Sequence, residues 1–149
     1  MTSLAERFAQ NLRWCREELG WSQSELASRA DVDSTLISRI ERNLVSVSLD
    51  RAARFAQVLG VELAALLDTP KGTKVPFGIH SQRAISSAQV MANVKSTREA
   101  AGLSQSVVAK RATLQRGYVS VLEKGETKLY LKTLEKLAAA LKVTPGELV

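Results

Sequence analysis

The sequence predicts an all-α protein made of two similar helical domains in tandem. Three observations support this fold class. Apolar residues recur at the three- and four-residue spacing of helices along most of the 149 residues, with N-cap and stop residues between the runs. The second half of the chain repeats the first half. The helical periodicity disappears once, between the two copies, where two of the three prolines fall.

The repeat defines the domain organisation. Shifting the chain by 82 positions lays residues 12–67 on residues 94–149 without a gap, and about 15 positions are then identical where chance gives about three. We therefore expect domains at residues 1–68 and 87–149, joined by a linker at residues 69–86. Each domain has about 60 residues, which is near the smallest size that folds alone and which small helical bundles achieve.

The first copy is expected to begin with a helix that stops at Gly20. Ser3 and Glu6 have the spacing of a capping box. The apolar stripe that follows should be buried; it consists of Leu4, Phe8, Leu12, Cys15 and Leu19. Because Cys15 lies on this stripe, we expect a small buried hydrophobe rather than a reactive or metal-binding thiol.

Residues 22–42 contain two short helical patterns with almost nothing between them. Ser22 and Glu25 form a second capping box, and Asp33 is a good N-cap for the next helix. Helices joined this tightly must cross steeply, so the second one should protrude, with Ile37 and Ile40 inward and its polar side outward. A protruding helix with small polar residues and an arginine fits the major groove of DNA.

The remaining helices follow from the same signals. Ser48 should cap a fourth helix that ends at Gly60, and a short leucine-rich helix follows at residues 62–67. This fifth helix could close the core or supply a dimer contact, and we favour the core. In the second copy we expect helices at residues 87–101, 105–111 and 116–124, the last with Gln115 at its capping position, and a final helix opened by Thr144, Pro145 and Glu147.

Residues 8–67 resemble the Cro/C1-type helix-turn-helix domain of bacterial and phage repressors, and the second copy resembles it as well. The resemblance rests on Ser22-Gln23, Leu26-Ala27, Val32, Ile37-Ser38, Ile40-Glu41-Arg42 and Leu59-Gly60-Val61. It implies two tandem five-helix DNA-binding bundles. The family usually has glycine where this chain has Asp31 and Asn43, and both residue types tolerate left-handed backbone. We therefore expect the two turns to be kept.

The resemblance also implies which residues contact DNA. Gln23 and Gln105 open the first motif helices, where the family's glutamine holds a phosphate; a solvated helix start is the alternative. The second motif helices, at residues 34–42 and 116–124, are the expected recognition helices. Their candidate DNA-binding residues are Ser34, Thr35, Ser38, Arg39, Arg42, Arg116, Ser120 and Lys124. Glu41 and Glu123 are expected to be structural and to pair with Arg16 and Arg98.

The two recognition helices cannot read the same base sequence. Arg39 can bind guanine through two hydrogen bonds, whereas Val121 at the equivalent position can at most touch a thymine methyl group. Gly117 lowers the helix propensity of the second copy. That copy either touches DNA with a different preference or serves mainly for dimerisation, and we favour DNA contacts from both copies.

These features predict a sequence-specific, double-stranded DNA-binding transcriptional regulator, a repressor and not an enzyme. The sequence has no Gly-rich phosphate loop, carboxylate cluster, Ser-His-Asp set or metal-ligand spacing. His80 is the single histidine, so we expect no metal site, no cofactor and no small-molecule ligand. The alternative is an antitoxin-like module that binds a partner protein and represses its own promoter. Such a module usually has an added segment that binds the partner, and only the linker could serve as that segment here.

Composition bears on the compartment and the partners. One cysteine excludes an intramolecular disulfide, and no apolar run is long enough to cross a membrane, so we expect a cytoplasmic, nucleoid-associated protein. A homodimer on a palindromic site is expected; alternatively, one chain acts as its own pair of domains. Residues 1–70 carry 8 basic and 10 acidic side chains, and residues 71–149 carry 13 and 5. The second copy should therefore anchor on phosphates while the first discriminates.

Overall fold

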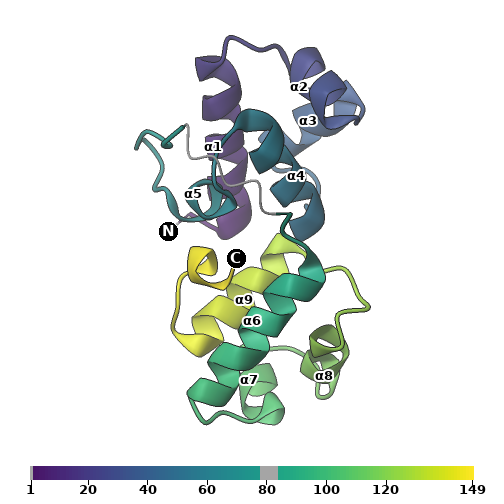
Figure 1. The fold of residues 1–149 in the computed structure, drawn as a ribbon, viewed down its shortest axis with the longest axis vertical. Helices are drawn as coiled ribbons and strands as arrows, with labels where there is room; N and C mark the ends of the chain where they lie inside the picture. Colours follow the sequence, from purple (N-terminus) through teal and green to yellow (C-terminus); the bar gives the residue numbers. More distant parts are fainter. Residues whose placement is uncertain (1, 78–83) are drawn as a thin grey trace.

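The computed structural model describes residues 2–77 and 84–149. Over these residues the chain forms nine α-helices, one short 3-10 helix and no strand. The elements are α1 (Leu4–Glu18), α2 (Gln23–Ala30), α3 (Ser34–Glu41), α4 (Leu49–Leu59), α5 (Leu63–Asp68), α6 (Ser87–Ala100), α7 (Gln105–Arg111), α8 (Tyr118–Glu123), α9 (Leu131–Leu141) and the 3-10 helix η1 (Pro145–Leu148). Figure 1 shows two bundles stacked along the long axis, with α1–α5 in one and α6–η1 in the other. The predicted all-α tandem fold is confirmed.

Side chains cap the helices of the first copy where the sequence indicated. Ser22 accepts a hydrogen bond from the Glu25 N–H at 3.1 Å, and the Glu25 carboxylate accepts one from the Ser22 N–H, so this capping box is complete. Asp33 accepts from the Thr35 N–H at 2.7 Å, and this bond lowers the pKa of the Asp33 carboxyl. These bonds satisfy N–H groups that the first turn of a helix leaves without partners.

The apolar faces of the helices form the core. The largest fully buried side chains come from both copies and include Phe8, Leu12, Leu26, Ile37, Ile40, Phe55, Leu66 and Met91. Cys15 is fully buried, as expected. Leu19 is 38% exposed and the expectation that it belongs to the buried stripe is wrong, because α1 ends at Glu18 and Leu19 is its C-cap.

The turns around the protruding helix keep a left-handed backbone without glycine. Asp31 and Asn43 both have φ of 56°, which confirms that these two residues can replace the family's usual glycines. The equivalent residues of the second copy, Thr113 and Gly125, have φ of 57° and 74°. The repeat in sequence is therefore a repeat in backbone conformation.

The second copy departs from expectation at two helices. Its protruding helix, α8, begins at Tyr118 and not at residue 116. Gly117 has φ of 88°, a conformation that a helix cannot contain, and the Tyr118 N–H bonds to the carbonyl of Gln115 in a turn instead of meeting a side-chain cap. The fifth element, η1, is a four-residue 3-10 helix, although Thr144 and Glu147 form the expected capping box.

The two bundles contact each other directly. Ser48 and Tyr130 form an antiparallel bridge, flanked by hydrogen bonds from the Leu49 N–H to the Leu129 carbonyl (2.7 Å) and from the Leu131 N–H to the Val47 carbonyl (3.0 Å). Helix α5 and the 3-10 helix η1, which are the last elements of the two copies, also pack on one another. The fifth helix of the first copy, expected mainly to close its own core, thus contributes to the junction as well.

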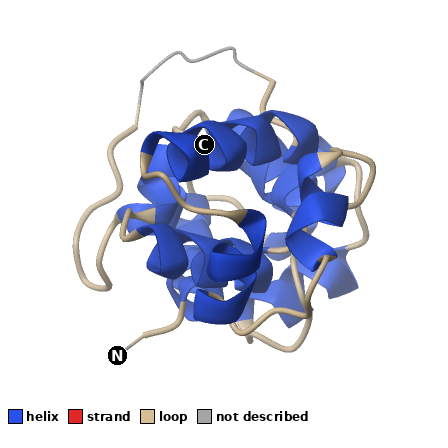
Figure 2. Cartoon of the chain, turned by 90° about the horizontal axis from the view of Figure 1, so that it is seen from below, coloured by secondary structure: helices blue, strands red, loops and turns tan. Residues whose placement is uncertain are grey.

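Part of the linker packs on the first bundle. Val75 is buried, and the Phe77 ring stacks on Trp14 with 5.9 Å between the ring centroids. Trp14 therefore packs between the first bundle and the start of the linker. Ile79 and His80 lie outside the described residues. Figure 2, coloured by secondary structure, shows helices joined by loops over the described residues. None of the helices in the described ranges is long and apolar enough to span a membrane.

Candidate nucleic-acid interface

The helix α3 protrudes because of how it packs on α2. Ala27, 3% exposed, lies on the buried side of α2, where a larger side chain would hold the two helices apart. On α3, Ile37 and Ile40 face the core and are 0% and 2% exposed. The opposite side of α3 consequently faces solvent, with Thr35 and Arg39 exposed.

A buried ion pair sets the orientation of α3 against α1. The Arg16 guanidinium donates to both carboxylate oxygens of Glu41, at 2.7 and 2.9 Å, and also to the Trp21 carbonyl at 2.7 Å. The two side chains are 11% and 3% exposed, and the hydrogen bond to Glu41 raises the pKa of Arg16. The predicted pairing is confirmed.

The second copy repeats this pair. The Arg98 guanidinium donates to the two carboxylate oxygens of Glu123 at 2.7 and 3.1 Å. It also donates to the Leu103 carbonyl at 2.9 Å. Helix α8 is therefore held on its bundle as α3 is, although it is shorter.

Both motif glutamines are tied to the same carboxylates. Gln23 Nε2 donates to Glu41 at 3.4 Å, and Gln105 Nε2 donates to Glu123 at 2.5 Å. A glutamine amide nitrogen has two hydrogens, so each of these side chains retains a second N–H beyond the bond to its carboxylate. These residues are half-buried, which argues against a merely solvated helix start.

The other candidate residues occupy two short surfaces. In the first copy Ser34, Thr35 and Arg39 are exposed on α3, Ser38 is half-buried, and Arg42 follows the helix as its C-cap. In the second copy Arg116 is exposed and precedes α8, Ser120 is half-buried on it, and Lys124 is its exposed C-cap. Val121, which takes the place of Arg39, is 43% exposed.

The junction brings together two basic residues that the sequence did not single out. Arg51 of α4 and Lys128 of the second copy line one shallow hollow beside the Ser48 and Tyr130 bridge, together with Leu36 of α3. Neither cation forms an ion pair within residues 2–77 and 84–149. Lys128 replaces Ser46 of the first copy, so the repeat gave no signal for this site.

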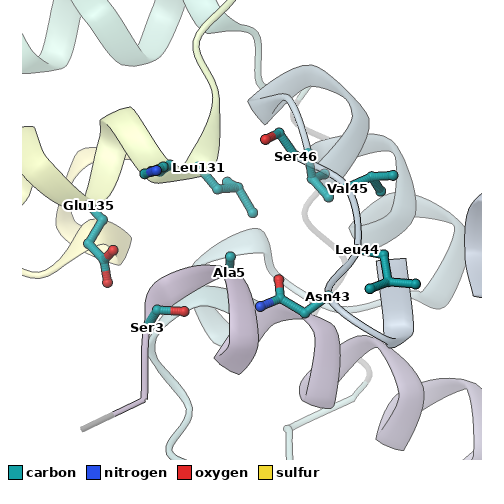
Figure 3. Close-up of a pocket in the computed structure, with 10 residues that line it drawn as sticks. Ser3, Ala5, Asn43, Leu44, Val45, Ser46, Leu131 and Glu135 are labelled. Atoms are coloured by element: carbon teal, nitrogen blue, oxygen red, sulfur yellow. The ribbon is translucent and has the colours of Figure 1, made fainter. Parts of the chain in front are cut away.

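A second hollow, of about 330 Å³, lies where the copies meet near the start of α1 (Figure 3). Leu44 and Leu131 line it from the two copies, and Glu135 accepts a hydrogen bond from the Leu4 N–H at 2.7 Å. The sequence did not indicate this hollow because it exists only once the copies are joined.

The described residues contain no group of His, Cys, Asp and Glu side chains that could hold a metal ion. His80, the histidine considered from the sequence, lies outside them. Burial raises the pKa of the Cys15 thiol to about 12, so this thiol is not poised for chemistry.

Comparison with known proteins identifies the repeated unit. A model of the helix-turn-helix family matches the chain twice, at residues 12–66 and 94–148. The chain belongs to the Cro/C1-type helix-turn-helix family. Helices α2 and α3 form the helix-turn-helix of the first copy, and α7 and α8 form that of the second. No solved structure matches the chain.

Three relatives share the helix-turn-helix region. The chain is 38% identical over 63 residues to a protein of Neisseria meningitidis named hypothetical transcription factor, covering 42% of this chain and 59% of the relative. It is 35% identical over 74 residues to the HTH-type transcriptional regulator SinR of Bacillus subtilis, covering 49% and 67%. It is 40% identical over 62 residues to the control protein C.BamHI of Bacillus amyloliquefaciens, covering 41% and 76%. The chain thus spans about three fifths of the length of the Neisseria relative.

Proposed function

We propose that the protein is a sequence-specific regulator that binds double-stranded DNA and represses transcription. The observation that carries the proposal is the duplicated helix-turn-helix, in which a buried bidentate ion pair holds each recognition helix with its polar side outward. The names of the relatives, a transcription factor and a transcriptional regulator among them, support it. Repression is favoured because no segment resembles an activation surface.

The proposed roles of the residues follow from position and chemistry. The domains are residues 1–68 and 87–149, joined by the linker at 69–86. Arg39, with Ser34, Thr35 and Ser38 beside it, reads base edges in the major groove. Gln23 and Gln105 hold phosphates at the starts of α2 and α7, and Arg42, Arg116, Ser120 and Lys124 complete the interface. The protein acts in the cytoplasm on the nucleoid and has no catalytic role.

Selection of bound fragments from random duplex DNA tests this function. The chain should enrich a defined motif at about 200 mM salt, where binding through phosphates alone is weak. Recovery of unrelated sequences at that salt concentration would count against a sequence-specific regulator. No observation in the described part of the chain favours the antitoxin-like alternative.

We also propose how many protein chains bind one DNA site. The sequence favoured a homodimer on a palindromic site and kept a single chain as the alternative. The direct contacts between the two copies favour the single chain, because they already pair two helix-turn-helix units within one molecule.

A further inference from the structure

The two copies meet around an approximate two-fold axis. Ser48 pairs with Tyr130, which is its own counterpart 82 positions further along the chain. The flanking hydrogen bonds exchange roles under the same shift. The Leu49 N–H donates to the Leu129 carbonyl. Leu131 is the counterpart of Leu49, and its N–H donates to the carbonyl of Val47, which is the counterpart of Leu129. A contact in which the same patch is used by both sides is the mark of a two-fold interface.

Farther along the junction, a second pair of equivalent elements is in contact. Helix α5 packs on η1, which is its equivalent in the repeat. Gly146 corresponds to Ala64, and a Cβ at Gly146 would lie 3.2 Å from the Ala64 Cβ and would collide with the Asp68 carboxylate. The close approach allows the Gly146 N–H and the Thr144 hydroxyl to donate to Asp68, at 3.0 and 2.9 Å.

The copies also cap each other's first helices. At the start of α1, the Leu4 N–H donates to Glu135 of α9 at 2.7 Å. At the start of α6, the Ser87 N–H donates to Asp50 of α4 at 2.8 Å. Each carboxylate lies at the positive end of a helix from the other copy, where an anion is stabilising. The helices that cap each other are therefore counterparts in the repeat, although Glu135 and Asp50 are not at equivalent positions.

The arrangement leaves both recognition helices on one side of the molecule. In Figure 1, α3 and α8 lie toward opposite ends of the long axis on the same side, while α5 and η1 lie on the other side. Arg51 and Lys128 line the junction between them, beside the Ser48 and Tyr130 bridge. Asp31 and Asp50 line one of these hollows as well, but neither cation forms an ion pair within the described residues, so both are available to a phosphate backbone.

We propose that one chain, acting as a monomer, occupies a bipartite DNA site whose two half-sites differ in sequence. This inference rests on the proposed DNA-binding function and specifies the kind of site. A second chain is not needed, because the patch that would make a two-fold dimer is already filled within the molecule. The half-sites differ because the recognition helices differ, with Arg39 in one and Val121 in the other.

The junction, and not the linker, sets the distance between the half-sites. Domains held by a flexible linker alone would tolerate a range of spacings. Domains joined by backbone pairing present their recognition helices at one separation, which for neighbouring major grooves is about one helical turn, or roughly 10 base pairs.

The test begins with the intact chain, by selection from random duplex DNA and by sedimentation of the selected complex. We expect a non-palindromic motif with two unlike parts and one chain per duplex. Absence of any enriched motif would overturn the proposed function itself. A palindromic motif bound by two chains, or a motif with one half-site only, would leave that function standing and overturn this inference.

Two variants then separate the junction from the recognition helices. The first variant lengthens the linker by ten Gly and Ser residues after the exposed Gly72, and it should leave the selected spacing unchanged. Adding 5 base pairs between the half-sites turns one half-site to the opposite face of the duplex. This change should weaken binding by at least about tenfold for both the original protein and the variant. A lengthened linker that rescues the 5-base-pair site shows independent domains and contradicts the proposal.

The second variant makes the two helices more alike. Arg116→Ser with Val121→Arg places first-copy residues at exposed positions of the second copy and leaves Gly117 in its left-handed turn. We expect the second half-site to change toward the first while the stoichiometry stays at one chain per duplex. A selected motif identical to that of the original protein shows that the second copy does not read bases.

Discussion

At the scale of single residues, the positions that decide the site are a buried ion pair, a buried thiol and one exposed arginine. Arg16 and Glu41 are side chains of opposite charge that satisfy each other inside the bundle, so each depends on its partner. Cys15 is neutral because its surroundings cannot solvate a thiolate. Arg39 is exposed on α3 and available to a partner.

Removing the carboxylate of the buried pair should destabilise the fold. Glu41→Gln leaves the Arg16 guanidinium buried without its counter-charge, and we expect the free energy of unfolding to fall by about 3 kcal/mol in urea denaturation. Glu17→Gln is the comparison variant, because Glu17 is half-exposed, pairs with Arg13 at 2.8 Å and reaches Arg16 only at 3.8 Å, so its loss should cost less than about 1 kcal/mol. Equal effects of the two substitutions would refute the structural role of Glu41.

The Cys15 thiol should make stability depend on alkaline pH. Its pKa in the folded protein is raised from 9.0 to about 12, so the unfolded chain loses the proton first as pH rises. The contribution to stability is therefore full below about pH 9 and is lost as the pH approaches 12. The difference in unfolding free energy between the original protein and Cys15→Ala should shift over that window, and a difference independent of pH would contradict the burial of the thiol.

Arg39 should contact a base edge. Arg39→Ala should weaken binding to the selected site by about 1–3 kcal/mol and change binding to unrelated duplex little. Fluorescence anisotropy with both duplexes measures the two affinities. A loss of the same size on both would assign Arg39 to a phosphate, and Arg13→Ala, on the exposed side of α1, serves as the charge-matched control.

At the scale of secondary-structure elements, the two recognition helices differ in how they begin. Helix α3 starts at Ser34 with Asp33 as a side-chain cap, whereas α8 starts at Tyr118 after a glycine turn. The shorter helix leaves Arg116 in the preceding turn, so the same position of the repeat has helical geometry in one copy and not in the other.

Substitution of Gly117 distinguishes the observed turn from the longer helix that the sequence predicted. Gly117 has φ of 88°, so Gly117→Ala should lower the free energy of unfolding by about 1 kcal/mol. Its counterpart Thr35 lies inside α3, where Thr35→Ala should change the free energy of unfolding by less than about 0.5 kcal/mol, because the better helix propensity of alanine offsets the lost side-chain hydrogen bond to Asp33. Stabilisation by Gly117→Ala would mean that the helix begins earlier.

At the scale of the whole molecule, the junction combines surfaces that neither copy has alone. The net charge of +6 comes from the linker and the second copy, since the first 70 residues have more acidic than basic side chains. The structure adds that Lys128 of the basic copy and Arg51 of the acidic copy line the same hollow, together with Leu36 of the first recognition helix. Anchoring on phosphates is thus proposed for the second copy and for the junction.

Lys128 should strengthen binding to any duplex. Lys128→Ala should reduce affinity by a similar factor on selected and unrelated sequences, and should lower the slope of the logarithm of affinity against the logarithm of salt concentration by about one. Lys71→Ala removes the same charge shortly after α5, a helix that lies on the opposite side of Figure 1 from α3 and α8, and should leave the slope unchanged. Equal slopes in all three proteins would place Lys128 away from the DNA.

The sequence by itself determined the features that depend on neighbours along the chain or on the repeat. Capping residues and apolar periodicity predicted nearly all helices, because each is set by bonds and contacts within a few positions. The pairing of Glu41 with Arg16 followed from the family resemblance, and its duplication at Glu123 and Arg98 followed from the repeat.

Only the tertiary structure decided how α8 begins and how the two copies meet. The start of α8 depends on a glycine whose sign of φ no sequence pattern specifies. The junction brings together residues about 80 positions apart, since Ser48 pairs with Tyr130 while Arg51 and Lys128 line one hollow, and proximity at that separation leaves no periodic signal in the sequence. Backbone pairing and helix capping between the copies arise only when both folded surfaces are present. They hold the two helix-turn-helix units together in one molecule.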